Sequence, residues 1–309
     1  MYNILGYVKV KWHIKRDMER RSCMLTFNNI YRPLTARPFL ADNTYREYSP
    51  CVSLAPYVAC YWTEGDYIPM DRRQNGSHNY EGNSREVLVI PDTCMDIIVN
   101  VNHTSQKITG YLCGIQDKPF LTQSREDSDI VSSFAIRFHF WAASFFFSMN
   151  LKDACNQTTE LEALGEGWGR LFAPFFYLTE VEERIAHVEA FLLQKLDKAE
   201  ENPDLLNSIQ RILSASGAVA VRDICEYSTV SQRQIERLFL QKIGMPPKKI
   251  ASLVRYQNVW REIVMSESFN AQNAVYRYGY TDQAHLLKEF RRFHGTNPEG
   301  AKKIAIKNQ

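Results

Sequence analysis

The spacing of apolar residues along the chain changes near residue 200. Before that point, short runs of β-branched and aromatic residues are separated by Gly, Pro, Asn and Asp, which predicts strands joined by turns. Residues 132–140 alternate, with Phe134 and Ile136 on one face and Arg137 and His139 on the other. After residue 200, apolar residues recur every three or four positions, which predicts amphipathic helices.

This change of pattern predicts an α+β fold in two domains. Successive strands without helices between them favour an antiparallel β-barrel, of cupin-like type, or a sandwich, with packed helices over residues 46–200. An apolar segment at 141–149 is expected to be a helix buried against the barrel. Glu200-Glu201-Asn202-Pro203 is the expected boundary, because Pro suits the first turn of a helix. Residues 202–309 then form an all-helical domain.

Residues 1–45 show little periodicity and carry four basic residues between Lys15 and Arg21, which predicts an irregular basic arm. An alternative is that the natural chain starts at Met24, because Arg20-Arg21 could be encoded by a purine-rich ribosome-binding sequence just upstream. Residues 1–23 would then be non-native. N-terminal sequencing of protein made from the native gene would refute this if Met1 were intact.

One predicted helix, at 179–200, could serve either its own domain or a second copy of the chain. Its apolar residues follow three-four spacing and are Leu178, Val181, Ile185, Val188 and Leu192. This stripe either packs on its own domain or forms a short coiled-coil seam in a homodimer.

Two segments after residue 218 repeat the order helix, turn, helix. In the first, Ser231 and Gln234 form a capping box, and Ile235 and Phe239 face inward. A long helix at 247–266 follows, and then the order repeats. This arrangement predicts two helix-turn-helix units.

The second helix of the repeat is expected over residues 281–298, with Thr281 as its N-cap. Its apolar stripe is Leu286, Leu287, Phe290 and Phe293. The spacing aligns Ile235 of the first unit with either His285 or Leu286. Each unit ends in Gly followed by Pro, which stops a helix.

These residues resemble the DNA-binding domain of the AraC/XylS family of bacterial transcription regulators over residues 203–303. The resemblance rests on YGYTDQAHL at 278–286, FRRF at 290–293, Gly295 and Pro298, with Arg255-Tyr256-Gln257 from the first half. Thr229 and Lys288 depart from the family pattern, which usually has glycine and arginine there.

The upstream residues also resemble an uncharacterised sensor-like domain that is often fused to this module. The segments that carry this resemblance are LAPYVACYW at 54–62, VIPDTCMDII at 89–98 and FAIRF at 134–138. Together the resemblances imply a cytoplasmic, sequence-specific transcription regulator. Its upstream domain would act as a ligand-sensing or dimerisation input.

The polar faces of the two second helices supply the candidate DNA contacts. Arginine suits guanine, glutamine suits adenine, and acidic groups suit cytosine in the major groove. The candidates for base edges are Gln232, Arg233, Glu236, Arg237, Gln283 and His285. The candidates for phosphate contacts, which position without specifying, are Lys248, Lys249, Lys288, Arg291 and Arg292. An alternative for His285 is that it only packs at the junction of helix and turn.

A small-molecule effector would bind in the upstream domain. The candidate pocket residues are Trp62, Asp92, Asp96, Arg137 and His139, each of which could equally serve the structure. Two other classes remain open, a cupin-like metalloenzyme and a non-regulatory DNA-binding or repair protein. No catalytic motif is evident, and the seven histidines are scattered without metal-ligand spacing, so no enzyme activity, cofactor or metal is expected.

Charge and cysteine content agree with a DNA-binding regulator. Residues 202–309 hold 16 Lys and Arg against 9 Asp and Glu, whereas the preceding residues hold 21 against 26. A basic module attached to an acidic remainder suits double-stranded DNA as a partner.

The seven cysteines form no CxxC pair, which favours reduced thiols in the cytoplasm. No apolar run predicts a membrane span. RNA polymerase is a further expected partner of a regulator.

Overall fold

The structure is a computed structural model that describes residues 26–34, 45–65, 87–122, 129–165, 167–228 and 230–307. The proposed start at Met24 and the unusual Thr229 lie outside these residues. The α+β class predicted from the sequence is confirmed.

One antiparallel sheet of six strands, in the order β1-β2-β7-β4-β5-β8, forms the N-terminal half. Its strands are β1 (Arg46–Tyr48), β2 (Val58–Glu64), β4 (Cys94–Asn102), β5 (Lys107–Cys113), β7 (Val131–His139) and β8 (Thr158–Glu160). A separate pair joins β3 (Val87–Val89) and β6 (Phe120–Thr122). The prediction of a barrel is wrong for the described strands, because β1 and β8 end the sheet and do not pair with each other.

Helices cover the apolar face of this sheet, so the sheet need not close on itself. They are η2 (Phe140–Ala142), α2 (Ala143–Phe146), η3 (Leu161–Leu164), α3 (Trp168–Leu171), η4 (Ala173–Phe176) and α4 (Val181–Lys198). The Phe134 ring of β7 packs edge-on against Phe175, with centroids 5.2 Å apart. Phe138 lies 5.1 Å from Phe146. The expected alternation along β7 and the buried segment after it are therefore both present.

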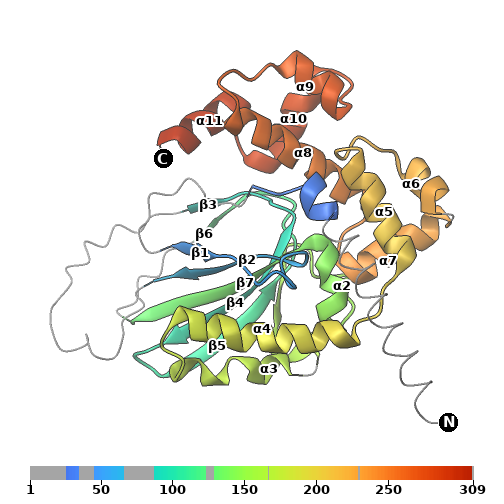
Figure 1. Cartoon of the computed structure of the whole chain (residues 1–309). Coiled ribbons are helices and arrows are strands. Elements are labelled where there is room, and N and C mark those ends of the chain that lie inside the picture. Colours follow the sequence, from blue (N-terminus) through green and yellow to red (C-terminus); the bar gives the residue numbers. More distant parts are fainter. Residues whose placement is uncertain are drawn as a thin grey trace, which may run out of the picture.

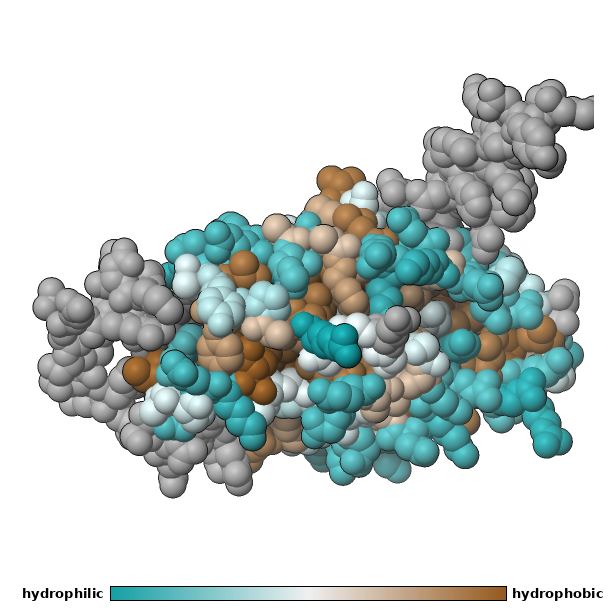
Figure 2. Space-filling model, turned by 90° about the horizontal axis from the view of Figure 1, so that it is seen from below, coloured by the Kyte–Doolittle hydropathy of each residue, from teal (hydrophilic) through white to brown (hydrophobic). Residues whose placement is uncertain are grey.

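Helix α4 runs beneath the sheet (Figure 1). Val188 and Leu192 are fully buried in this single chain. The stripe that could have formed a coiled-coil seam is therefore used to pack α4 on its own domain. The surface seen from below is mainly hydrophilic, with apolar side chains in patches between polar ones (Figure 2).

All described regular elements of the C-terminal part are helices. These are α5 (Pro203–Ser214), α6 (Val221–Ser228), α7 (Gln232–Ile243), α8 (Pro247–Met265), α9 (Ala271–Tyr278), α10 (Gln283–His294) and α11 (Pro298–Lys307). The Asn202 side chain caps α5 by accepting from the Leu205 amide at 2.9 Å. Among the described residues, none of the helices combines the length and apolarity that a bilayer crossing requires.

Residues 26–34 differ from the prediction of an irregular arm. Residues 26–30 are helical, and Phe27 and Tyr31 are buried against Trp141, with Phe27 centred 5.6 Å from the indole. The segment lies between the sheet and the C-terminal helices (Figure 1). It therefore belongs to the contact between the two halves.

Candidate nucleic-acid interface

Helices α7 and α10, called the reading helices below, are equivalent elements of the two helix-turn-helix units. Each has twelve residues, and each ends at a glycine with positive φ, 84° at Gly244 and 81° at Gly295. Ile235 and Leu286 lie 51 positions apart and are both fully buried. Burial thus decides the alignment in favour of Leu286 over His285.

Local capping sets the start of each reading helix. Ser231 and Gln234 form the predicted capping box of α7. In α10 the prediction of Thr281 as the N-cap is wrong, because Asp282 takes that position and accepts from the His285 amide at 2.7 Å. A carboxylate there also suits the positive end of the helix dipole.

The base-reading candidates lie at the exposed N-terminal halves of the reading helices, with one partial exception. Gln232, Arg233, Arg237, Gln283 and His285 are exposed, whereas Glu236 is half-buried. Glu236 accepts from Gln232 Nε2 at 2.8 Å. Gln283 donates to Gln272 of α9 at 2.7 Å. The contact between Gln283 and Gln272 joins two neutral amides, so it can be exchanged for a base contact without leaving a charge buried.

His285 has contacts that position it at the turn. Its Nδ1 lies 3.3 Å from Thr281 Oγ1, and its ring meets the Tyr280 ring edge-on, with centroids 5.3 Å apart. These contacts favour the alternative in which His285 shapes the junction of turn and helix. Its counterpart in α7 is Gln234, which also serves a cap.

Four of the five phosphate candidates are exposed, and the fifth is engaged by the N-terminal half. Lys248, Lys288, Arg291 and Arg292 lie at the surface. Lys249, at the start of α8, forms an ion pair with Asp117. Burial raises the pKa of Asp117, but hydrogen bonds from Lys249 and Asn156 outweigh it and leave the pKa below its ordinary value.

Two apolar residues on the outer face of α10 were not expected there from the sequence. Leu287 was expected in the buried stripe, but it is 38% exposed, and Ala284 is exposed too. The stripe is complete without Leu287, because Leu286, Phe290 and Phe293 fill it. A count of 100° per residue from Leu286 and Phe290 could have placed Leu287 at the rim.

Helix α8 joins the two units and is bonded to the second by side chains. Arg255 donates from Nε and Nη2 to Glu289 of α10 at 3.0 and 2.8 Å, and its guanidinium lies over the Tyr280 ring at 4.3 Å. Tyr256 Oη lies 2.9 Å from His294 Nδ1. The burial of α8 extends beyond its apolar stripe, because Tyr256 and Gln257 are buried too.

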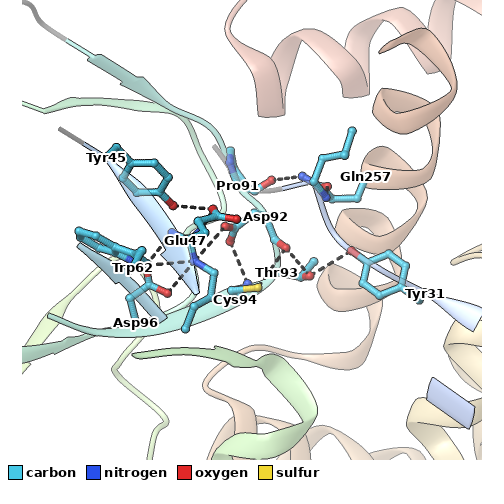
Figure 3. Close-up of polar contacts among 12 residues, drawn as sticks. Tyr31, Tyr45, Glu47, Trp62, Pro91, Asp92, Thr93, Cys94, Asp96 and Gln257 are labelled. Carbon is cyan, nitrogen blue, oxygen red and sulfur yellow. Dashed lines mark hydrogen bonds and ion pairs between the residues drawn. The ribbon is translucent and has the colours of Figure 1, made fainter. Parts of the chain in front are cut away.

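Four of the five pocket candidates come together on the sheet face opposite the helices. Together with Glu47 they form the Arg137 cluster, which is Trp62, Asp92, Asp96, Arg137 and Glu47 (Figure 3). Arg137 donates to both Asp96 carboxylate oxygens, at 2.9 and 2.8 Å, and Trp62 Nε1 donates to Asp96 at 3.1 Å. His139 is separate, because it stacks on Trp141 at 4.4 Å.

The charged groups of Arg137, Asp92 and Asp96 are largely buried, whereas Glu47 at the edge of the cluster is exposed. Burial raises the pKa of Asp92 above its usual range, although Arg137 opposes this shift. Arg137 Nη1 has no hydrogen-bond partner among the described residues and lies 4.0 Å from Glu47. The described part of the chain contains no group of three His, Cys, Asp or Glu side chains that could hold a metal. A cavity of about 160 Å³ lies at the far end of β4, lined by polar residues that include Asn100, Lys107 and Asp129.

Contacts from the N-terminal half reach α8 near its middle. Gln257, 1% exposed, donates to the Pro91 carbonyl at 2.6 Å and accepts from the Leu34 amide at 2.9 Å (Figure 3). Thr93 Oγ1 lies 3.0 Å from Tyr31 Oη in the same region. The loop before β4 and the segment at 31–34 are thus both fastened to one side chain of α8.

Further contacts reach the C-terminal ends of both reading helices. The Leu151 amide donates to the Gln241 carbonyl of α7 at 3.0 Å. A Cβ at Gly295, which caps α10, would meet the Pro119 ring at 3.6 Å. The N-terminal half therefore contacts both helix-turn-helix units at the ends opposite their exposed reading faces.

Comparison with known families identifies the type of domain that contains the two helix-turn-helix units. Residues 224–303, which span both units, match the family model described as "Helix-turn-helix domain". The C-terminal part is an AraC-type helix-turn-helix domain. Residues 46–160 match a model described as "Domain of unknown function (DUF6597)" and precede the AraC-type domain in the chain. The prediction of a DNA-binding transcription regulator is thereby confirmed.

Several solved structures are also similar to this chain. An AraC-type transcriptional regulator from Chromobacterium violaceum is 21% identical, with 33% of this chain and 92% of that chain covered and a TM-score of 0.30. ToxT from Vibrio cholerae is 12% identical, with 72% and 95% covered and a TM-score of 0.39. An unsaturated fatty acid is bound in one ToxT structure. No curated protein matches the chain.

Proposed function

We propose that this regulator places α7 and α10 in successive major grooves on one face of double-stranded DNA. The observation that supports this is the shared register of the two helices, each buried along one stripe and exposed at its N-terminal half. Successive grooves on one face lie roughly 34 Å apart. The ion pair between Arg255 and Glu289 would help α8 to hold the second unit at a fixed distance from the first.

The base contacts follow from side-chain chemistry. Arg233 and Arg237 would each donate two hydrogen bonds to guanine, and Gln232 and Gln283 would pair with adenine. Glu236 would accept from cytosine if it released Gln232. His285 would act mainly by holding the turn before α10.

The phosphate contacts would come from the exposed cations Lys248, Lys288, Arg291 and Arg292. Lys249 would join them only after release from Asp117. The charge of Arg292 also acts on Asp117. Asp117 would therefore compete with DNA phosphate for cations of both units.

The N-terminal domain would be the regulatory input, acting through its contacts with α8. Asp92 of the Arg137 cluster lies between Pro91 and Thr93, and both neighbours bond to residues at the domain contact. A small-molecule effector that altered the Arg137 cluster could thus shift the position of this loop. A homodimer and contact with RNA polymerase belong to the same proposal. A dimer would need a surface other than the buried stripe of α4.

Selection of bound sequences from random DNA tests this function. The full chain should enrich a site with two half-sites about 10 base pairs apart, with G·C pairs in the half facing α7. Arg237→Ala should lose preference at one base pair. Lys242→Ala, a cation at the far end of the same helix, should keep it. Binding without sequence preference would favour a repair or architectural protein. Stoichiometric iron, manganese or zinc in the purified protein would favour the metalloenzyme.

A further inference from the structure

The outer faces of the two reading helices differ in chemistry although their buried faces agree. With Ile235 aligned to Leu286, the register places Ala284 where α7 has Arg233 and Leu287 where α7 has Glu236. Both residues of α10 are exposed. The second reading face is therefore apolar at these two positions, whereas the first is charged there.

Polar and basic groups surround this apolar centre. Gln283 precedes it, and Lys288 and Arg291 follow on the exposed side of α10. Cations at this spacing suit DNA phosphates, so the groove floor would lie beneath Ala284 and Leu287. The apolar group on the floor of a major groove is the C5 methyl of thymine.

We propose that Leu287, with Ala284 beside it, contacts thymine methyl groups in the half-site read by α10. This half-site is then an A·T-containing sequence, in which Gln283 pairs with adenine and Leu287 packs on thymine. The other half-site is recognised through arginine and glutamate. The operator is therefore asymmetric, and this asymmetry sets the direction in which the protein lies on DNA. The inference rests on the proposed function.

The test is a double-mutant cycle that removes the thymine C5 methyl group from the DNA and the Leu287 side chain from the protein, separately and together. Thymine is replaced by deoxyuridine, which lacks only the C5 methyl, at each position of the selected site. Full-length wild-type protein should lose about threefold to tenfold in affinity at one or two positions of the α10 half-site. Leu287→Ala should bind more weakly to the thymine site and be indifferent to the replacement at the position that Leu287 contacts.

Matched controls separate this contact from other losses. Lys288→Ala should weaken binding but keep the preference for thymine over deoxyuridine. Met265→Ala removes a residue that is 68% exposed at the end of α8 and should change neither property. Ala284→Arg, which copies Arg233, should change the selected base at its position toward guanine; this readout does not depend on Leu287→Ala folding.

The outcomes distinguish this inference from the proposed function. In one outcome, selection yields two half-sites while wild-type protein binds the thymine and deoxyuridine versions with equal affinity. That result would overturn the contact and leave the two-groove binding intact. The contact would also be overturned if Leu287→Ala kept the full preference for thymine. A selection without two half-sites would overturn the proposed function and this inference with it.

Discussion

The replacement Gln257→Met tests whether one side chain of α8 fastens the N-terminal domain to the DNA-binding domain. Methionine keeps the length of the side chain but removes both polar groups. The Pro91 carbonyl then loses its donor at 2.6 Å, and the Leu34 amide loses its acceptor at 2.9 Å. Gln257 is 1% exposed, so water does not readily replace either partner.

The expected loss follows from the two buried groups left unsatisfied. Each costs about 1–3 kcal/mol, so the contact should weaken by roughly 2–6 kcal/mol. Local opening of the segment at 31–34 should become at least about 30-fold more frequent. The reading faces themselves are not touched by the change.

Hydrogen exchange of the full chain measures this opening. The Leu34 amide should exchange at least about 30-fold faster in Gln257→Met, and peptides covering Pro91 to Cys94 should also lose protection. Asn258→Ala is the control, because the neighbouring Asn258 bonds only weakly, at 3.5 Å, to Ser216 within its own domain. If both variants exchanged like the wild type at Leu34, Gln257 would not fasten the domains and the route from Asp92 to α8 would fail.

Three further predictions concern charge and DNA reading. Asp117→Asn should free Lys249, raise DNA affinity about fivefold and steepen the salt dependence by roughly one phosphate contact, as equilibrium binding at several salt concentrations would measure. If neither the affinity nor its salt dependence changed, Asp117 would not compete with DNA phosphate for Lys249. Arg237→Ala should cost about 1–3 kcal/mol on the selected site and relax one base pair, whereas uniform weakening on all sequences would contradict a base contact. Burial lowers the pKa of His139 to about 3 and that of His294 to about 4, below the unfolded value. The free energy of unfolding therefore keeps its full value above about pH 6.5, where these histidines are neutral in both states. It falls by roughly 2 kcal/mol per histidine between pH 7 and pH 5, because the unfolded chain binds the proton and the folded chain does not. Denaturant titrations at both pH values measure this. His294→Ile should halve the loss, and an equal loss in wild type and variant would contradict the assignment.

The C-terminal helices could be predicted because their signals are local. Periodicity, the capping box at Ser231 and the glycines at Gly244 and Gly295 each act within a few residues. The ambiguities that remained were local too. Thr281 and Asp282 are both good caps, and only the backbone decides between them. Leu287 is adjacent to the stripe, so hydrophobicity alone placed it wrongly.

The N-terminal domain was less predictable because its features depend on distant pairs. The alternation along β7 revealed a strand, but whether the sheet closes depends on which strands form its edges. Lys249 looked like a phosphate contact because its partner, Asp117, lies far away in the sequence. The convergence of Trp62, Asp96 and Arg137 could be proposed from their residue types, but their mutual hydrogen bonds could not.

The spacing between half-sites tests the two-groove clamp most directly. The selected site would be rebuilt with 5 or 10 base pairs inserted between its halves, and the affinity of the full chain would be measured for each. Five base pairs turn the second half-site to the opposite face of DNA, since one turn takes about 10–10.5 base pairs. A two-groove clamp should lose at least about tenfold in affinity with either insertion, because α8 cannot span an added turn and both reading helices contribute to binding. Unchanged affinity with either insertion would contradict the clamp.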